Sequence, residues 1–153
     1  MRVILENIRS VHNVGSMFRT ADGAGVEKVY LSGFTPDVFN RLGEERNQFT
    51  KVSLGAEKFI EWERAEDTVA LIKKLQKEGF KVIAVEQTKA ALWHTDFKPE
   101  SLNKTVFVFG HEVDGVSKDV LEACDGAIMI KMRGQKKSLN VSVAFGIIVY
   151  HYA

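Results

Sequence analysis

The chain has 153 residues, a length typical of one domain and sufficient to bury a hydrophobic core. Hydrophobic residues make up 45% of it and charged residues 27%, so the composition excludes disordered and fibrous proteins and predicts a globular one. The net charge of +1 neither supports nor excludes a nucleic-acid partner, because RNA binding requires a local basic patch rather than a basic total.

Apolar segments alternate with amphipathic segments from the N-terminus onward, which predicts an α/β fold with a mostly parallel sheet flanked by helices. The expected strands lie near 2–6, 27–32, 80–85, 105–109 and 126–130. The expected helices lie near 14–24, 66–78, 117–123 and 139–152. Residues 33–65 are weakly patterned and are expected to form a loop with short elements, a candidate substrate contact. No repeat or linker interrupts the chain, so residues 1–153 are predicted to form a single domain.

The predicted C-terminal helix is apolar on nearly every side, and a helix of this kind must be buried all round. The apolar residues are Val141, Val143, Phe145, Ile147, Ile148 and Val149. Either one face packs on the sheet of the same chain and another on a partner subunit, or the helix forms the centre of the core. The pattern alone does not distinguish these arrangements.

Cys124 is the only cysteine, so an intramolecular disulfide is impossible and a structural zinc site is not expected. The N-terminus begins with the strand-like Val3, Ile4 and Leu5 and lacks the charged and apolar regions of a signal peptide. The longest apolar run, at 143–152, is too short to span a bilayer. We therefore expect a cytoplasmic protein without a membrane partner or a bound metal.

The last third of the chain predicts a ligand pocket built from loops. An apolar strand ends at Gly110, a residue type that permits tight turns and close approach of a ligand, and Glu112 follows it. A second apolar strand leads to Ser138 and Asn140 at the head of a helix, where polar side chains cap free N–H groups. Ligands of open α/β sheets bind beyond the carboxyl ends of the strands, so these residues are candidates for one site.

Three groups of residues form motifs in chain order. They are Asn13, Gly15 and Arg19; Gly110, Glu112 and Gly115; and Ile130, Met132, Gly134, Ser138, Leu139, Asn140 and Ser142. Together they closely resemble the motifs of the SpoU or TrmH-like branch of the SPOUT RNA methyltransferases. The resemblance covers essentially the whole chain, since LGAE at 54–57 and VEQT at 85–88 also match.

The resemblance implies a single SpoU/TrmH-like methyltransferase domain over 1–153, with no additional RNA-binding domain. It implies a deep C-terminal trefoil knot and a homodimer that pairs across the helices near 14–24 and 139–152. The implied activity transfers a methyl group from S-adenosylmethionine to a ribose 2′-hydroxyl of tRNA or rRNA. A catalytically weak RNA- or cofactor-binding module of the same fold is the alternative. A nucleotide-dependent oxidoreductase is disfavoured, because the glycines at 23–25 lack the third glycine of a dinucleotide fingerprint.

The resemblance also implies roles for individual residues. The implied catalytic residues are Asn13, Arg19, Glu112, Ser138 and Asn140, and the implied cofactor contacts are Gly110, Ile130, Met132 and Leu139. Arginine is a poor base because its pKa lies above about 12, so Arg19 is expected to orient substrate and stabilise charge. Glu112 is expected to order the cofactor loop or the dimer edge rather than to transfer a proton. On structure alone, Asn13 is most typical of a helix cap, Arg19 of a solvated helix residue and Glu112 of an exposed turn carboxylate. Ser138 and Asn140 are also typical of caps, the four cofactor residues are also typical of core at strand ends, and His111 is expected to be incidental.

Four cations without an acid among them follow the last strand: Lys131, Arg133, Lys136 and Lys137. They are predicted to contact the RNA backbone, although a run of this kind is also typical of a solvated face. Lys131 departs from the resemblance, since the family usually has proline there. Proline would fix the backbone beside the adenine, so lysine is expected to loosen the loop and weaken cofactor affinity.

Overall fold

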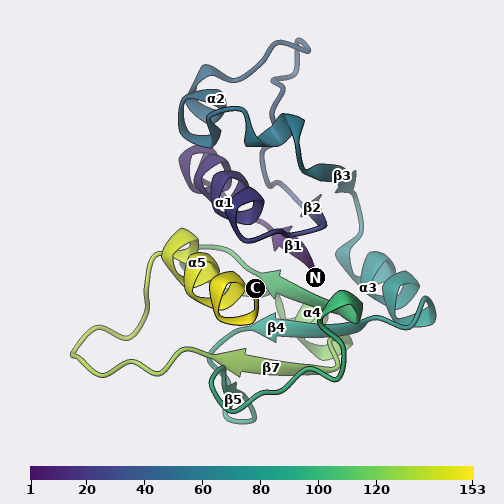
Figure 1. The fold of residues 1–153 in the computed structure, drawn as a ribbon, viewed down its shortest axis with the longest axis vertical. Coiled ribbons are helices and arrows are strands. Elements are labelled where there is room, and N and C mark those ends of the chain that lie inside the picture. Colours follow the sequence, from purple (N-terminus) through teal and green to yellow (C-terminus); the bar gives the residue numbers. More distant parts are fainter.

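The computed structural model describes residues 1–153 and contains one seven-stranded sheet with helices on both faces (Figure 1). The strand order is β3-β2-β1-β6-β4-β7-β5, and every neighbouring pair is parallel. The strands are β1 (Arg2–Glu6), β2 (Lys28–Ser32), β3 (Glu61–Ala65), β4 (Lys81–Val85), β5 (Leu92–Trp93), β6 (Thr105–Phe109) and β7 (Gly126–Met129). The helices are α1 (Val11–Gly23), α2 (Asn47–Ser53), α3 (Thr68–Lys77), α4 (Lys118–Ala123) and α5 (Val141–Tyr152), with 3-10 turns η1 (Ala56–Lys58) and η2 (Leu102–Lys104). The predicted α/β class is confirmed.

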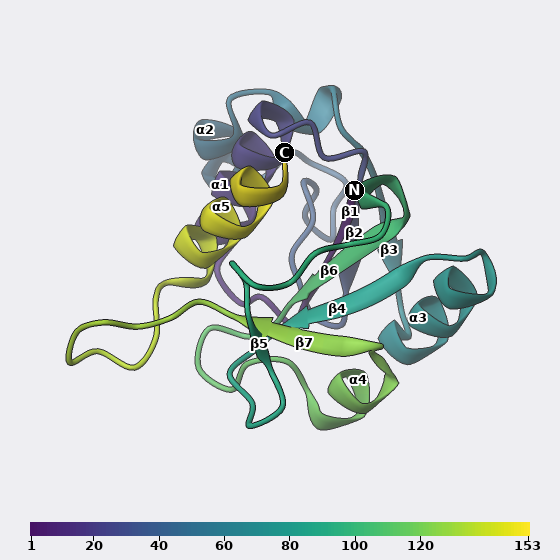
Figure 2. The same cartoon turned by 60° about the horizontal axis from the view of Figure 1, so that its bottom comes forward.

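The sheet separates two hydrophobic cores, because successive side chains of a strand point to opposite faces. Val3 and Leu5 of β1 belong to the core under α1, α2 and α5, whereas Ile4 belongs to the core under α3 and α4. Figure 2 shows these two groups of helices on opposite faces of the sheet. The central strand β6 buries all five of its residues, as expected for a strand that is covered on both sides.

The sequence patterns did not predict three of the elements, namely β3, β5 and α2. β3 is an edge strand whose polar residues are stabilised by its neighbour: Lys28 Nζ of β2 lies 2.5 Å from Glu61 and 2.7 Å from Glu63. β5 has only two residues, too few for a pattern. Residues 33–65 contain α2, η1 and β3, which agrees with the expectation of a loop with short elements.

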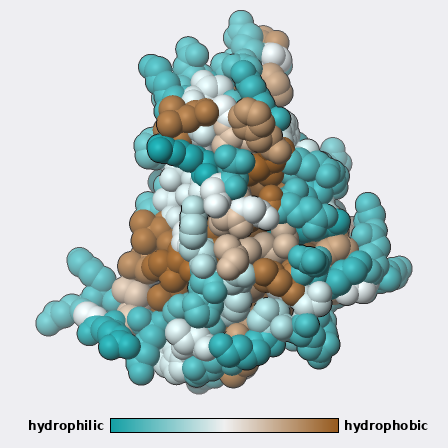
Figure 3. Space-filling view, viewed as in Figure 1, coloured by the Kyte–Doolittle hydropathy of each residue, from teal (hydrophilic) through white to brown (hydrophobic).

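Helix α5 is buried on one side only. Phe145, Ile148 and Val149 are fully buried, while Val143, Ile147 and Tyr150 are 50%, 37% and 58% exposed. Within one chain, the interpretation of this helix as the centre of the core is therefore wrong. We call these three exposed residues the α5 stripe. Figure 3 shows a hydrophobic area at the left of the molecule, over α5.

The C-terminal segment, residues 137–152, forms hydrogen bonds at both of its ends with the residues that follow β4. Gln87 Nε2 donates to the carbonyl oxygen of Lys137 at 2.6 Å. At the other end, the Tyr152 hydroxyl donates to the carbonyl oxygen of His94 at 2.6 Å, and its ring stacks on Phe107 with centroids 5.0 Å apart. Burial raises the pKa of Tyr152 to about 12, so the hydroxyl remains a donor. None of the helices combines the length and apolar character that a membrane-spanning helix requires.

Candidate functional site

The loops after β4, β6 and β7 meet at one edge of the sheet, because the carboxyl ends of parallel strands lie together. They line a cavity of about 180 Å³ that is open to solvent. Its walls come from residues 85–87 and 109–115 and from the segment between Met129 and Ala144. This is the edge at which the sequence predicts a ligand pocket.

A tight turn after β6 forms one wall of the cavity. A Cβ atom on Gly110 would lie 2.2 Å from the nitrogen of Val116 and 2.3 Å from the carbonyl carbon of Gly115, so only glycine fits there. His111 and Gly115 exchange two backbone hydrogen bonds of 3.0 Å, and Gly115 adopts a positive φ of 72°. The His111 side chain is not incidental, since its Nδ1 lies 3.2 Å from the nitrogen of Asp114 and 3.0 Å from its carboxylate.

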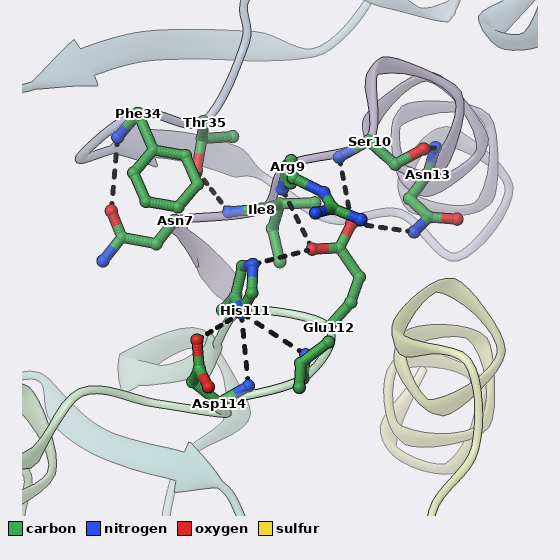
Figure 4. A network of polar contacts seen from close by, with 11 residues as sticks. Asn7, Ile8, Arg9, Ser10, Asn13, Phe34, Thr35, His111, Glu112 and Asp114 are labelled. Carbon is green, nitrogen blue, oxygen red and sulfur yellow. Dashed lines mark hydrogen bonds and ion pairs between the residues drawn. The ribbon is translucent and has the colours of Figure 1, made fainter.

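The turn directs Glu112 toward the N-terminus of α1 (Figure 4). Its Oε2 accepts from the amide of Arg9 at 3.0 Å, and its Oε1 accepts from the amide of Ser10 at 2.9 Å and from Asn13 Nδ2 at 3.0 Å. Burial by itself would raise the pKa of Glu112, but these hydrogen bonds outweigh burial and the pKa is lowered. An ionised carboxylate that already accepts three hydrogen bonds is suited to joining two segments rather than to carrying a proton.

Asn13 links the first motif to the other two. It is not the N-cap of α1: that residue is Ser10, whose hydroxyl accepts from the amide of Asn13 at 3.2 Å. The Asn13 side chain is therefore free to donate to Glu112 and to accept from Asn140 Nδ2 at 3.4 Å. Asn140 caps α5 at the same time, since its Oδ1 accepts from the amide of Ser142 at 2.8 Å. Ser138 lines the cavity and caps no helix.

Two further carboxylates hold the far end of the turn. Neither was assigned a role from the sequence, although Glu86 lies in the matched VEQT stretch at 85–88. Glu86 Oε2 accepts from the amide of Val116 at 2.8 Å. Glu6, only 3% exposed, accepts from the amide of Ser117 at 3.0 Å and from its hydroxyl at 2.5 Å. Both glutamates stand at the carboxyl end of an apolar strand, which is the signal that could have identified them.

The four residues predicted to contact a cofactor all line the cavity: Gly110, Ile130, Met132 and Leu139. With Met129 and Val141 they form an apolar wall, and polar groups of Gln87, His111 and Ser138 stand around it. A few polar groups around an apolar wall are typical of sites for small organic ligands.

Arg19 is not brought to this cavity within one chain. It lies on the exposed face of α1, forms no ion pair or side-chain hydrogen bond, and does not line the cavity. Gly15 of the same motif has a packing role, because a Cβ there would lie 2.9 Å from the carbonyl oxygen of Phe49 in α2.

The predicted RNA-binding residues lie together on the irregular segment between β7 and α5, which projects from the body of the protein in Figures 1 and 2. They are Lys131, Arg133, Lys136 and Lys137, all exposed and without an ion pair. Lys131 Nζ lies 5.4 Å from the centroid of the Trp93 ring, so one of the four cations has an aromatic neighbour. No group of three or more His, Cys, Asp or Glu side chains is placed to hold a metal ion.

The fold and the site together define an α/β protein with a small-molecule pocket at the carboxyl edge of a parallel sheet and a polar rim built from distant segments. Residues 1–150 match the SpoU rRNA Methylase family, and the chain belongs to this family.

Two curated relatives are tRNA (guanosine(18)-2'-O)-methyltransferases. The protein from Aquifex aeolicus is 31% identical over 97% of this chain and 66% of its own length, and that from Thermus thermophilus is 33% identical over 98% and 72%. This chain therefore spans about two thirds of these relatives. The SpoU methyltransferase AviRb from Streptomyces viridochromogenes, solved in complex with AdoMet, superposes with a TM-score of 0.85 at 21% identity, covering 98% of this chain and 58% of that one. At this identity the likeness shows the fold.

Proposed function

We propose that this protein is an S-adenosylmethionine-dependent RNA methyltransferase that modifies a ribose 2′-hydroxyl of tRNA or rRNA. The observation that carries the proposal is the contact of Glu112, Asn13 and Asn140, which joins three distant segments at the rim of the pocket. The names of the relatives support the RNA substrate, and the AviRb complex supports the cofactor. We also propose a cytoplasmic location, since the enzyme must reach these RNAs.

The residues of the cavity fit S-adenosylmethionine. Ile130, Met132 and Leu139 offer an apolar wall for a flat adenine ring, and Gly110 contributes backbone to the same cavity. The cavity of about 180 Å³ is smaller than the roughly 300–1,000 Å³ typical of ligand pockets, so part of the cofactor would lie at the open rim. When bound, the cofactor supplies an electrophilic methyl group.

The polar rim would hold the substrate ribose. The Glu112 carboxylate accepts a hydrogen bond from the side-chain amide of Asn13, and the side-chain oxygen of Asn13 accepts one from Asn140. The long contact of 3.4 Å leaves Asn140 able to bond a ribose hydroxyl, beside Ser138 on the cavity wall. Alignment of that hydroxyl contributes to catalysis by lowering the entropic part of the barrier.

We propose that the protein acts as a homodimer through α1 and α5. The two helices lie against each other, since a Cβ on Gly23 would meet the Tyr150 hydroxyl at 2.6 Å. Tyr150 belongs to the exposed α5 stripe, and exposed apolar patches mark interaction sites. Arg19 is exposed on the same pair of helices and does not serve its own pocket, so we propose that it acts on the ribose at the pocket of the partner subunit.

We further propose that residues 1–153 act as one unit and that the C-terminal segment is threaded as a trefoil knot. The bonds of Lys137 to Gln87 and of Tyr152 to His94 support the knot, because both ends of the segment contact the same stretch of chain. Joining the termini of the folded protein and then denaturing it tests the threading. A threaded ring migrates as a more compact species in size exclusion than an unthreaded one.

The activity is tested with total RNA from a strain that lacks this gene. The purified protein should bind S-adenosylmethionine in calorimetry and transfer a labelled methyl group, and nucleoside mass spectrometry should find a 2′-O-methylated nucleoside. Cofactor binding without transfer to tRNA or rRNA would contradict the proposal. It would support the alternative of a catalytically weak binding module, for which the departure from the family at Lys131 is the main argument. Absence of cofactor binding would contradict the proposed activity, and the alternative would then be a module that binds RNA alone.

A further inference from the structure

An exposed aromatic side chain stands beside the pocket on the turn after β2. Phe34 is 59% exposed, and its ring meets the His111 ring edge to face with centroids 5.9 Å apart. His111 lines the cavity, so Phe34 lies beside one of its lining residues (Figure 4). Single exposed aromatic residues are common on protein surfaces, so it is the position of Phe34 beside a residue of the pocket that makes it a candidate ligand contact.

The turn that carries Phe34 is held from several sides. Gly33 has a positive φ of 60°, and a Cβ there would lie 1.9 Å from Asn7 Oδ1, the atom that accepts from the amide of Phe34 at 3.2 Å. Thr35 is fully buried; its hydroxyl accepts from the amide of Ile8 at 3.0 Å and donates to the carbonyl oxygen of Leu5 at 2.8 Å.

Arg64 completes this arrangement from β3. Its guanidinium donates to the carbonyl oxygens of Thr35 at 2.8 Å and Gly33 at 2.6 Å, on either side of Phe34. A backbone fixed on both sides presents the aromatic ring in one place, so a partner that stacks on it loses little conformational entropy.

The surroundings favour a nucleic-acid base as the partner. Arg9 is exposed and forms no ion pair, and Figure 4 shows it between the Phe34 turn and Asn13. An exposed guanidinium before α1 and an exposed aromatic ring after β2 together suit a base with its phosphate, because the ring can stack on the base while the cation pairs with the phosphate.

We propose that Phe34, supported by His111, is a stacking platform for an unpaired base of the substrate RNA at the mouth of the pocket. The inference rests on the proposed function and deepens it. Stacking on an aromatic face accepts any base but requires it to be out of a duplex. The substrate class is therefore a loop or single-stranded nucleotide, and paired regions are excluded.

The test uses the full-length protein and a single-stranded RNA of about 12 nucleotides, within the site sizes known for single-strand binders, with 2-aminopurine at its centre. Controls are the same RNA with that base removed and the same RNA in a duplex. The variants are Phe34→Ala, Phe34→Leu and Phe34→Trp, with Phe59→Ala as the matched control, because Phe59 is 79% exposed and lies outside the cavity wall. Affinity, 2-aminopurine fluorescence, S-adenosylmethionine affinity and sedimentation are measured for each.

The wild-type protein should quench the fluorophore and bind the single strand roughly 5- to 100-fold more tightly than the abasic RNA or the duplex. Phe34→Ala and Phe34→Leu should remove this preference, Phe34→Trp should restore it, and Phe59→Ala should leave it unchanged. Cofactor affinity should be the same in all variants.

Quenching and affinity unchanged in Phe34→Ala would overturn the proposal. A loss of the dimer in that variant with unchanged quenching would also overturn it, because Phe34 would then be a subunit contact. A protein that shows the Phe34 effect but does not bind S-adenosylmethionine would refute the proposed function and leave the stacking platform standing.

Discussion

The Glu112→Gln substitution tests whether this side chain is the joint between the turn after β6 and the start of α1. Glutamine keeps the size of the side chain but replaces one acceptor oxygen with an NH₂ group. A donor then faces either the amide of Arg9 or the donors of Ser10 and Asn13. In the variant, two donors face each other where a carboxylate oxygen accepted a hydrogen bond, while the packing of the side chain is nearly unchanged.

The expected loss follows from these contacts. Hydrogen bonds to a charged group contribute about 1.5–3 kcal/mol each, and an unpaired buried donor costs about 1–3 kcal/mol. The Glu112 side chain is 19% exposed, so solvent relieves only part of the cost. We expect the free energy of unfolding to fall by about 2–4 kcal/mol at pH 7.

The lowered pKa of Glu112 determines how this loss depends on pH. A carboxyl group with a lower pKa in the folded state stabilises the protein above its unfolded value of about 4.3. This contribution disappears as the pH falls through the folded pKa. The difference between wild type and Glu112→Gln should therefore be complete at pH 7 and shrink below about pH 4.

Urea unfolding followed by circular dichroism, at pH 7 and at about pH 3, measures both effects. Glu66→Gln is the control, since Glu66 is exposed and forms no side-chain hydrogen bond or ion pair, and the charge change is the same. Calorimetry should also show weaker S-adenosylmethionine binding for Glu112→Gln alone. A stability equal to that of the control, or a loss equal at both pH values, would refute the assignment of Glu112 as a joint.

Further substitutions test the remaining proposals. Arg19→Ala should leave S-adenosylmethionine affinity nearly unchanged but lower methyl transfer at least about 100-fold, and normal turnover would remove Arg19 from the active site. Ile147→Lys should place a charge in the α5 stripe and give a monomer of 17.2 kDa in sedimentation, whereas an intact dimer would contradict the proposed interface. Neutralising Lys136 and Lys137 together should lower the log–log salt slope of RNA binding by roughly 0.7–0.9 for each lost phosphate contact, with cofactor affinity unchanged. A constant slope would mean that the basic run is only a solvated face, and Lys131→Pro should instead tighten cofactor binding by pre-ordering the loop.

The central part of the fold could be predicted because strands buried on both faces appear in sequence as continuous apolar runs. β6 is such a strand, and its position was correct to the residue. The edge strand β3 could not be recognised this way, because Glu61 and Glu63 gain their partner Lys28 only when the strands pair. Local pattern carries no information on a stabilising contact that spans more than thirty residues.

The candidate site shows the same division. The motifs identified Asn13 and Glu112 but could not show their contact, which joins residues 99 positions apart. Without the motifs, the local sequence favoured Asn13 as the cap of α1, whereas Ser10 has that role and leaves the Asn13 side chain available for the site. The cap was ambiguous because several polar residues of similar capping ability precede the helix.

The long separation between the joined residues has a consequence for biosynthesis. A chain leaves the ribosome N-terminus first at about 5–20 residues per second, so Asn13 waits roughly 5–20 s until Glu112 has been made. Asn140 arrives later still, 28 residues after Glu112. During translation, β1 is made before its partner strand β6, and α1 is made before Glu112, which accepts hydrogen bonds from residues at its start. The rim can therefore assemble only after Asn140 has been made, when both strands and helices of the N-terminal half are already outside the ribosome.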